Sequence, residues 1–168
     1  YLGFYGAIFH LLNHGLSKAM MFLCCGALMI SFGTTDMRQL GTKKHSRLMA
    51  ICFFIGAAAI GGMPPLNGFW SKFAIYVAAG QAHLWWPLGI SLFTSLLTLA
   101  VLIRAGAMIF LQNNHGGHSH AAAAVQETAP SRPCPATMMS VIVLMTALVI
   151  VTGMNLGSVN HLIELSAR

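Results

Sequence analysis

The sequence predicts an all-α integral membrane protein with about four transmembrane helices. Its 168 residues are 57% hydrophobic and only 7% charged, whereas soluble domains carry about 25% charged residues. The apolar residues gather in long runs, which is typical of helices that cross a bilayer. The net charge of +6 does not indicate nucleic-acid binding, because the cations are scattered or confined to one short loop.

The first predicted span covers about residues 1–32 and ends at a glycine followed by cap-type residues, 33–36. A short polar loop follows, residues 37–47. It carries four cations: Arg38, Lys43, Lys44 and Arg47. Because positive residues concentrate in cytoplasmic loops, we expect this loop on the cytoplasmic side.

The second span, about residues 48–80, is longer than the roughly 20 residues that cross a bilayer, and Gly-Gly-Met-Pro-Pro-Leu-Asn-Gly (61–68) interrupts it. Two prolines flanked by glycines cannot continue a helix. We therefore predict a discontinuous helix, with Pro64, Pro65 and Gly68 shaping the break. Irregular backbone at membrane depth needs protein or a watery cavity around it, and transporters use such breaks to build ion sites.

The third span, about residues 87–111, contains Arg104 in its second half. The short reconnection before it, residues 81–86, has no Lys or Arg, as expected of an outside loop. Trp85 and Trp86 should lie at the membrane interface.

The remaining sequence divides into a linker and a last span. Residues 113–135 are rich in His, Ala and Pro, a composition typical of a flexible linker, and the final span with its short tail occupies residues 136–168. We expect residues 1–112 to form the core unit. Alternation of the spans then places the His-rich linker inside and both termini outside.

His10, His14 and Lys18 follow one another at intervals of four residues inside the first span. Side chains four apart lie one above the other on nearly the same face of a helix. Ionisable residues in a membrane span are costly, and by default they mark an ion or proton pathway. The alternative is a pair of neutral interior histidines, each hydrogen-bonded to a neighbouring helix.

Lys72 and Arg104 are two further cations in apolar spans. The chain's three acidic residues, Asp36, Glu127 and Glu164, all fall in loops or the tail. A lysine in the membrane must find a partner, borrow water or lose its proton. We therefore expect counter-carboxylates from outside this chain. Snorkelling to the headgroups is the alternative; it is strongest for Arg104, which we treat as an auxiliary charge.

Nothing in the sequence predicts a cofactor, a metal site or a redox or hydrolytic centre. His10 and His14 have the spacing of a zinc-protease motif, but Leu11 replaces its general-base glutamate. The four cysteines, Cys24, Cys25, Cys52 and Cys134, contain no CxxC pair. The histidines of residues 115–120 are the remaining metal candidates, although such a segment is more often merely polar.

Three motifs, read together, resemble the antiporter-like membrane subunits of respiratory complex I, Mrp-type antiporters and energy-converting hydrogenases. They are His-Leu-Leu-Asn-His-Gly-Leu-Ser-Lys-Ala (10–19), Gly-Thr-Thr-Asp-Met-Arg-Gln-Leu-Gly (33–41) and Ile-Gly-Ala-Ala-Ala-Ile-Gly-Gly-Met-Pro-Pro-Leu-Asn-Gly-Phe-Trp-Ser-Lys (55–72). The resemblance implies inverted repeats, each with a broken helix. It also implies that Lys18 is the central relay lysine, that His10 and His14 are its hydrated partners and that Lys72 is the terminal lysine near the exit side.

The chain resembles only the C-terminal portion of such proteins, since the first repeat with its glutamate–lysine pair is missing. It begins at Tyr1 within an apolar segment, so we expect a piece of a longer protein or one half of a split one. Partner membrane subunits would then supply the missing repeat and the counter-carboxylates.

The resulting expectation is a proton-translocating subunit, or a C-terminal fragment of one, of a redox-driven complex in the cell inner (plasma) membrane. An NADH:quinone oxidoreductase or a membrane-bound hydrogenase fits this description. The alternatives are a Mrp-type cation/proton antiporter subunit, a subunit coupled to inorganic-carbon uptake and a non-conducting structural remnant. Sodium is less favoured, because the spans offer few oxygen ligands beyond Asn13, Asn67, hydroxyl groups and freed carbonyls.

Overall fold

The computed structural model describes residues 2–41, 46–111 and 134–154, and every regular element in these segments is a helix. The all-α prediction is therefore confirmed for the described residues. The elements are α1 (Leu2–Phe32), α2 (Met37–Gly41), α3 (Arg47–Gly61), α4 (Asn67–Gln81), α5 (Trp85–Gly106), the π-helix η1 (Ala107–Leu111) and α6 (Ala136–Met154).

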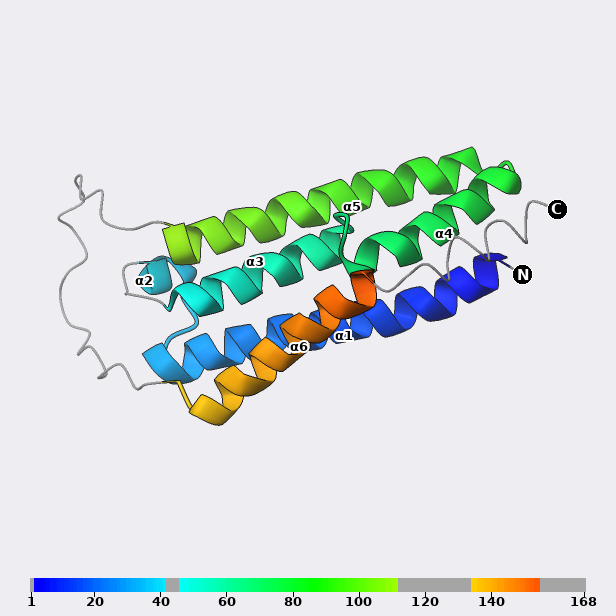
Figure 1. Ribbon diagram of the computed structural model, residues 1–168. Coiled ribbons are helices and arrows are strands. Elements are labelled where there is room, and N and C mark those ends of the chain that lie inside the picture. The colour runs from blue at the N-terminus through cyan, green and yellow to red at the C-terminus, as the bar shows by residue number, and fades with distance from the viewer. Residues whose placement is uncertain (1, 42–45, 112–133, 155–168) are drawn as a thin grey trace.

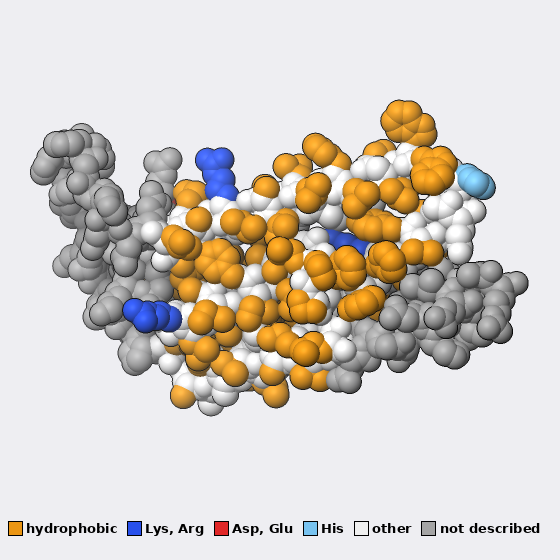
Figure 2. Space-filling view, turned by 45° about the horizontal axis from the view of Figure 1, so that its top comes forward, with side chains coloured by type: hydrophobic (Ala, Val, Ile, Leu, Met, Phe, Trp, Pro, Cys, Tyr) orange, Lys and Arg blue, Asp and Glu red, His pale blue; other side chains and the backbone are white. Residues whose placement is uncertain are grey.

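Three of the described helices are long and apolar enough to cross a membrane: Gly6–Phe32 of α1, Trp85–Leu111 of α5 with η1, and Ala136–Met154 of α6. α3 and α4 lie end to end beside α5 (Figure 1). Each has 15 residues, or about 22 Å at 1.5 Å per residue. The pair is the discontinuous helix that the sequence predicts. Hydrophobic side chains cover most of the described surface in Figure 2, as expected of a protein in lipid.

Gly62 ends α3 in the left-handed conformation, with φ of 83°, which glycine adopts without strain. Its N–H donates to the carbonyls of Ala58 and Ala59, and the N–H of Met63 also donates to Ala58. These bonds form a glycine-type helix cap. Because Pro64 and Pro65 follow and have no N–H, the chain resumes a helix only at Asn67.

A buried polar contact holds the start of α4 against α1. The Asn13 side-chain amide donates to the Asn67 backbone carbonyl at 3.2 Å, and the Asn67 amide donates to Asn13 Oδ1 at 3.4 Å. The Ser17 hydroxyl lies 3.5 Å from Asn67 Oδ1. All three residues are buried. Neither lipid nor an apolar core offers their polar atoms a hydrogen-bond partner, so these bonds satisfy them.

Helices also meet at the break with almost no space between their backbones. A Cβ atom on Gly68 would overlap the carbonyl of Ala59 at the end of α3. A Cβ atom on Gly153, near the end of α6, would overlap the backbone of Pro65, Leu66 and Asn67. Figure 1 shows the last turn of α6 against the junction of α3 and α4. The break is thus enclosed by α1, α3 and α6.

The apolar core lies among α1, α3 and α6, where Cys24, Cys52 and Ile142 are buried.

Two predictions about the connections between spans are corrected by the structure. Residues 37–47, predicted as a polar loop, contain the short helix α2. The reason is that Leu40 of α2 is buried in the same cluster as Ile109 of η1. Trp85 and Trp86, predicted in the reconnection, instead form the first turn of α5.

The His-rich part of the predicted linker and the tail after Met154 lie outside the described residues, as does the four-residue stretch 42–45. The candidate metal ligands of residues 115–120 are among them.

Replacing Gly68 with alanine tests the close contact at the break. We expect Gly68→Ala to lower the free energy of unfolding by about 1–3 kcal/mol, because the added methyl group forces α3 and α4 apart. The measurement is thermal unfolding of the detergent-solubilised protein. Gly80→Ala is the matched control in the same helix, since nothing lies within 4 Å of its Cβ position. Equal stability of the two variants would contradict this packing.

The contact between Asn13 and Asn67 can be measured with a double-mutant cycle. Each single alanine variant leaves the other amide buried without its partner, which costs about 1–3 kcal/mol. The double variant should therefore lose less stability than the sum of the two single losses, with a coupling of about 0.5–3 kcal/mol. Additive losses would show that the two amides do not bond in the folded protein.

Candidate functional site

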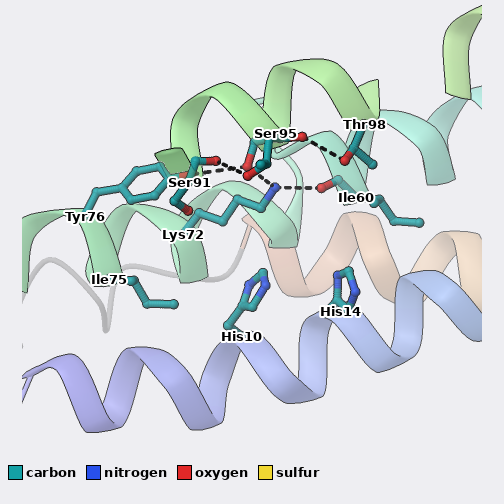
Figure 3. A pocket seen from close by; sticks show the side chains of 10 residues that line it. His10, His14, Ile60, Lys72, Ile75, Tyr76, Ser91, Ser95 and Thr98 are labelled. Carbon is teal, nitrogen blue, oxygen red and sulfur yellow. Dashed lines mark hydrogen bonds between the residues drawn. The ribbon is translucent and has the colours of Figure 1, made fainter. Parts of the chain in front are cut away.

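A cavity of about 260 Å³ lies beside the break, between α1, α4, α5 and the end of α3. Such a volume is large enough for several water molecules. Histidine, lysine, tyrosine and hydroxyl side chains line much of it, as Figure 3 shows. The lining residues are His10, His14, Ile60, Lys72, Ile75, Tyr76, Ser91, Thr94, Ser95 and Thr98.

Lys72 uses all three donors of its ammonium group in this cavity. Nζ donates to the backbone carbonyl of Ile60 at 2.8 Å, to that of Gly61 at 3.4 Å and to Ser95 Oγ at 2.9 Å. The lysine stem lies over Gly62, where a Cβ atom would come within 3.0 Å of Cδ. The side chain therefore points to the end of α3 and not along its own helix toward the headgroups.

The carbonyls bound by Lys72 are those that the helix end leaves free. The last four carbonyls of an α-helix have no partner within the helix. In α3, the N–H groups of Gly62 and Met63 bind two of them, Ala58 and Ala59. Lys72 binds the other two, Ile60 and Gly61. Because the C-terminal end of a helix carries partial negative charge, it stabilises the ammonium without a carboxylate.

The two histidines of α1 face the same cavity (Figure 3). Their rings are stacked, with centroids 5.2 Å apart. His10 Nδ1 lies 3.0 Å from Ser71 Oγ, and the Ser71 hydroxyl donates its one proton to the carbonyl of Gly68 at 3.1 Å. With the Ser71 proton on Gly68, His10 Nδ1 is the donor to Ser71; in the other tautomer Ser71 donates to Nδ1 and Nε2 carries the proton. A neutral His10 in the first tautomer has an unprotonated Nε2, which can accept a proton.

Sequence reasoning missed Ser71, Tyr76 and Ser95 as site residues. Ser95 accepts from Lys72 and lies 3.3 Å from the Tyr76 hydroxyl, so two polar contacts join α4 to α5 at this residue. The sequence does contain a pattern that indicates this polar face. Hydroxyl residues recur in α5 at intervals of three and four and so share one side of the helix: Ser91, Thr94, Ser95 and Thr98.

Lys18 and Arg104 do not line the cavity, and both side chains are exposed. The reason lies in helix geometry: at 3.6 residues per turn, a residue eight positions along is rotated by about 80°. Lys18 therefore lies on a different face of α1 from His10. The structure brings His10 and His14 together with Lys72 and leaves Lys18 one turn further along the helix.

The side chains that line this cavity include groups that can take up and release protons. It holds an amine, two imidazoles, a phenol and several hydroxyls, and no carboxylate is among its lining residues. Within the described part of the chain, no group of three or more His, Cys, Asp or Glu residues is placed to hold a metal ion. Cys24, Cys25, Cys52 and Cys134 are free thiols.

Comparison with known proteins places the chain in a family. Residues 1–98 match the family described as NADH:quinone oxidoreductase/Mrp antiporter, transmembrane. The chain is similar to a subunit of the Na(+)/H(+) antiporter of Alkalihalophilus pseudofirmus, with 38% identity over 68% of this chain and 23% of the relative. It is also similar to the NAD(P)H-quinone oxidoreductase chain 5 of Synechocystis, with 41% identity over 52% of this chain and 15% of the relative.

A third relative matches almost the whole chain. Formate hydrogenlyase subunit 3 of Escherichia coli is 29% identical over 90% of this chain and 25% of the relative. The chain thus spans a quarter or less of the length of these three proteins. The family match runs from α1 to residue 98 in α5, and so includes the break and the cavity. The chain belongs to the NADH:quinone oxidoreductase/Mrp antiporter family of multi-pass membrane proteins.

Proposed function

We propose that this chain carries protons across the membrane as part of a subunit of a redox-driven complex, of the kind represented by NADH:quinone oxidoreductases and membrane-bound hydrogenases. The similarity to quinone oxidoreductase and formate hydrogenlyase subunits supports this proposal. The redox centres belong to other subunits, and the location is the cell inner (plasma) membrane. The electron-transfer reaction acts on this chain through electric fields, by shifting the protonation of its lysines.

The observation that carries the proposal is the position of the Lys72 ammonium in the cavity. Its bonds to Ile60, Gly61 and Ser95 stabilise the protonated form. The apolar protein and lipid around the cavity favour the neutral amine. A group under these opposing influences can take up and release a proton when the charge nearby changes, which is the property that a relay needs.

The histidines provide the next acceptors. His10 Nε2 is free to accept once Nδ1 donates to Ser71, and His14 stacks on His10 with a ring-centroid distance of 5.2 Å. When Lys72 releases its proton, water in the cavity can pass it to these rings. The hydroxyls of Ser95 and Tyr76 then orient the neutral amine.

Lys18 continues the path beyond the cavity. It follows His14 by one turn and reaches the exposed side of α1. We propose that a proton moves along His10, His14 and Lys18 toward groups supplied by other membrane subunits. Arg104, exposed on α5, would add only an auxiliary charge.

Sodium transport, the activity named for the antiporter relative, is less well supported by this site. Sodium needs several oxygen ligands. The free carbonyls of Ile60 and Gly61 already bind an ammonium, and Asn13 and Asn67 are bonded to each other. The positive charge of Lys72 also repels a second cation from the cavity.

Substituting Lys72 with arginine separates proton transfer from helix capping. Arginine keeps the donors that bind the end of α3, but it stays charged at all physiological pH values. We expect Lys72→Arg to assemble normally and to reduce proton uptake by roughly 100-fold or more, the range of general acid–base catalysis. The measurement is proton uptake into sealed vesicles that contain the native complex, driven by its own redox reaction.

Arg47→Gln is the control, because it removes an exposed cation at the start of α3, far from the cavity. It should pump as the wild type does. Normal pumping by Lys72→Arg at normal assembly would assign Lys72 a purely structural role and favour the scaffold alternative.

Coupling to protons and not to sodium leads to a second prediction. Proton uptake by the wild-type complex should be unchanged when choline replaces all sodium, because the Lys72 ammonium already binds the carbonyls of Ile60 and Gly61 and repels a second cation. A sodium ionophore should likewise have no effect on the rate. Proton uptake that stops without sodium would favour the antiporter alternative.

A further inference from the structure

Two hydroxyl groups lead away from the Lys72 ammonium along a chain of hydrogen bonds. Lys72 Nζ donates to Ser95 Oγ at 2.9 Å, and Ser95 Oγ lies 3.3 Å from Tyr76 Oη, where either hydroxyl can be the donor. Figure 3 shows the ammonium between this pair and the histidines of α1. Within the described residues, no direct hydrogen bond joins Lys72 to His10 or His14. The hydroxyl pair is therefore the bonded neighbour of the ammonium on the side of α5.

The protonated lysine favours one order of these bonds. An ammonium group has three donors and no acceptor. Two of its N–H groups bind the carbonyls of Ile60 and Gly61, and Ser95 accepts the third. The Ser95 proton is then free to point to Tyr76 Oη, which lies within reach. In this order the bonds run outward, from Lys72 to Ser95 and from Ser95 to Tyr76.

The neutral lysine requires the opposite order. A neutral amine has two N–H groups and one lone pair, and the carbonyls at the end of α3 hold the two N–H groups. The lone pair then faces Ser95, which must donate its single proton to Lys72 Nζ. Because Ser95 has no proton left for the phenol, Tyr76 must donate to Ser95. The bonds now run inward, from Tyr76 through Ser95 to Lys72.

We propose that Tyr76 and Ser95 form a proton wire that reloads Lys72 after its proton has moved to the histidines. A hydronium ion in the cavity water gives a proton to Tyr76 Oη, the phenol proton moves to Ser95 Oγ, and the Ser95 proton moves to Lys72 Nζ. Each oxygen of the pair gains a proton and loses one, so a single positive charge passes from the water to the amine. The inference rests on the proposed proton transport, for which it names a loading route.

The transfer itself converts the inward order of bonds into the outward one. After it, the new N–H of Lys72 points to Ser95, and the proton that Ser95 received from the phenol points back to Tyr76. These are the bonds that the ammonium favours. When Lys72 next becomes neutral, rotation of the two O–H groups about their C–O bonds resets the wire.

The hydroxyl pair differs from the histidines in the charge that it holds. A protonated His10 or His14 adds a positive charge to the cavity that contains the Lys72 ammonium, and no carboxylate is among the lining residues. Two like charges in one cavity oppose each other. The hydroxyls return to neutral within the transfer, so they deliver a proton without storing a charge beside Lys72. Loading along α4 and α5 is thus separate from unloading along α1.

The test is proton uptake by sealed vesicles that contain the native complex, driven by its own redox reaction. Tyr76→Phe keeps the aromatic ring but removes the hydroxyl that starts the wire, and it leaves every bond of the ammonium in place. We expect uptake to fall by roughly 100-fold at normal assembly, as expected when a proton-transfer group is removed.

The second hydroxyl offers a rescue and a control. Ser95→Ala should also stop the transfer, whereas Ser95→Thr keeps a hydroxyl at the same position and should pump. Thr152→Val is the matched control, because it removes a hydroxyl that binds only carbonyls of its own helix, α6. It should pump as the wild type does.

A fluorinated tyrosine separates proton transfer from packing. 3,5-Difluorotyrosine at position 76 keeps the ring and the hydroxyl, but it is a stronger acid than tyrosine, which ionises at a pH of about 10. An ionised phenol has no proton to pass on. The uptake relative to that of the unsubstituted complex should therefore decline as the pH rises, in a range where the tyrosine protein still pumps fully.

Wild-type uptake by Tyr76→Phe overturns the wire, as does a pH profile that difluorotyrosine leaves unchanged. Equal losses with Ser95→Thr and Ser95→Ala also overturn it. Difluorotyrosine keeps the contacts of the phenol, so it decides the question even if Tyr76→Phe prevents assembly. The relay has its own test: if Lys72→Arg stops uptake while Tyr76→Phe pumps normally, the relay stands and the wire fails, whereas normal pumping by Lys72→Arg rejects the proposed function itself.

Discussion

The ammonium of Lys72 against the open end of α3 is the contact on which the site depends. A helix that stops inside a membrane leaves carbonyls with neither water nor a helical partner, and each unsatisfied group there costs several kcal/mol. Gly62 and Met63 bind two of these carbonyls, and Lys72 binds the remaining two. The same bonds place a charge in the apolar region. One side chain therefore stabilises the break and supplies the protonatable group of the cavity.

The break remains in place because its neighbours leave no room for another arrangement. Gly68 allows α4 to start against the carbonyl of Ala59, and Gly153 allows α6 to cross the irregular segment. Asn13 of α1 bonds both the backbone and the side chain of Asn67. The helix that presents the two histidines thus also fixes the start of the helix that presents the cavity lysine. The geometry of the cavity is set by packing at the break, not by flexible loops.

The sequence predicted the elements of this site better than their contacts. The two prolines and their flanking glycines indicate a break whatever surrounds them, because their backbone chemistry excludes a helix. Lys18 shows the limit of such reasoning: its spacing from His10 indicates a common face, yet a rotation of about 80° over eight residues takes it out of the cavity. Asn13 and Asn67 could likewise be counted as cation ligands, but their mutual bonds appear only when α1 and α4 pack together.

Lys18 and Lys72 are compensated in two different ways, and the difference gives each a different role. Lys72 finds fixed dipoles inside the chain, so its charge can be stabilised wherever α3 and α4 are folded. Lys18 finds nothing comparable in the described residues, so its charge depends on what lies beside the exposed face of α1. A change of charge in a neighbouring subunit would therefore be felt first at Lys18 and only then, through His14 and His10, at Lys72. The proposed path of protons and the proposed path of coupling would both pass through His10, His14 and Lys18 of α1, in opposite directions.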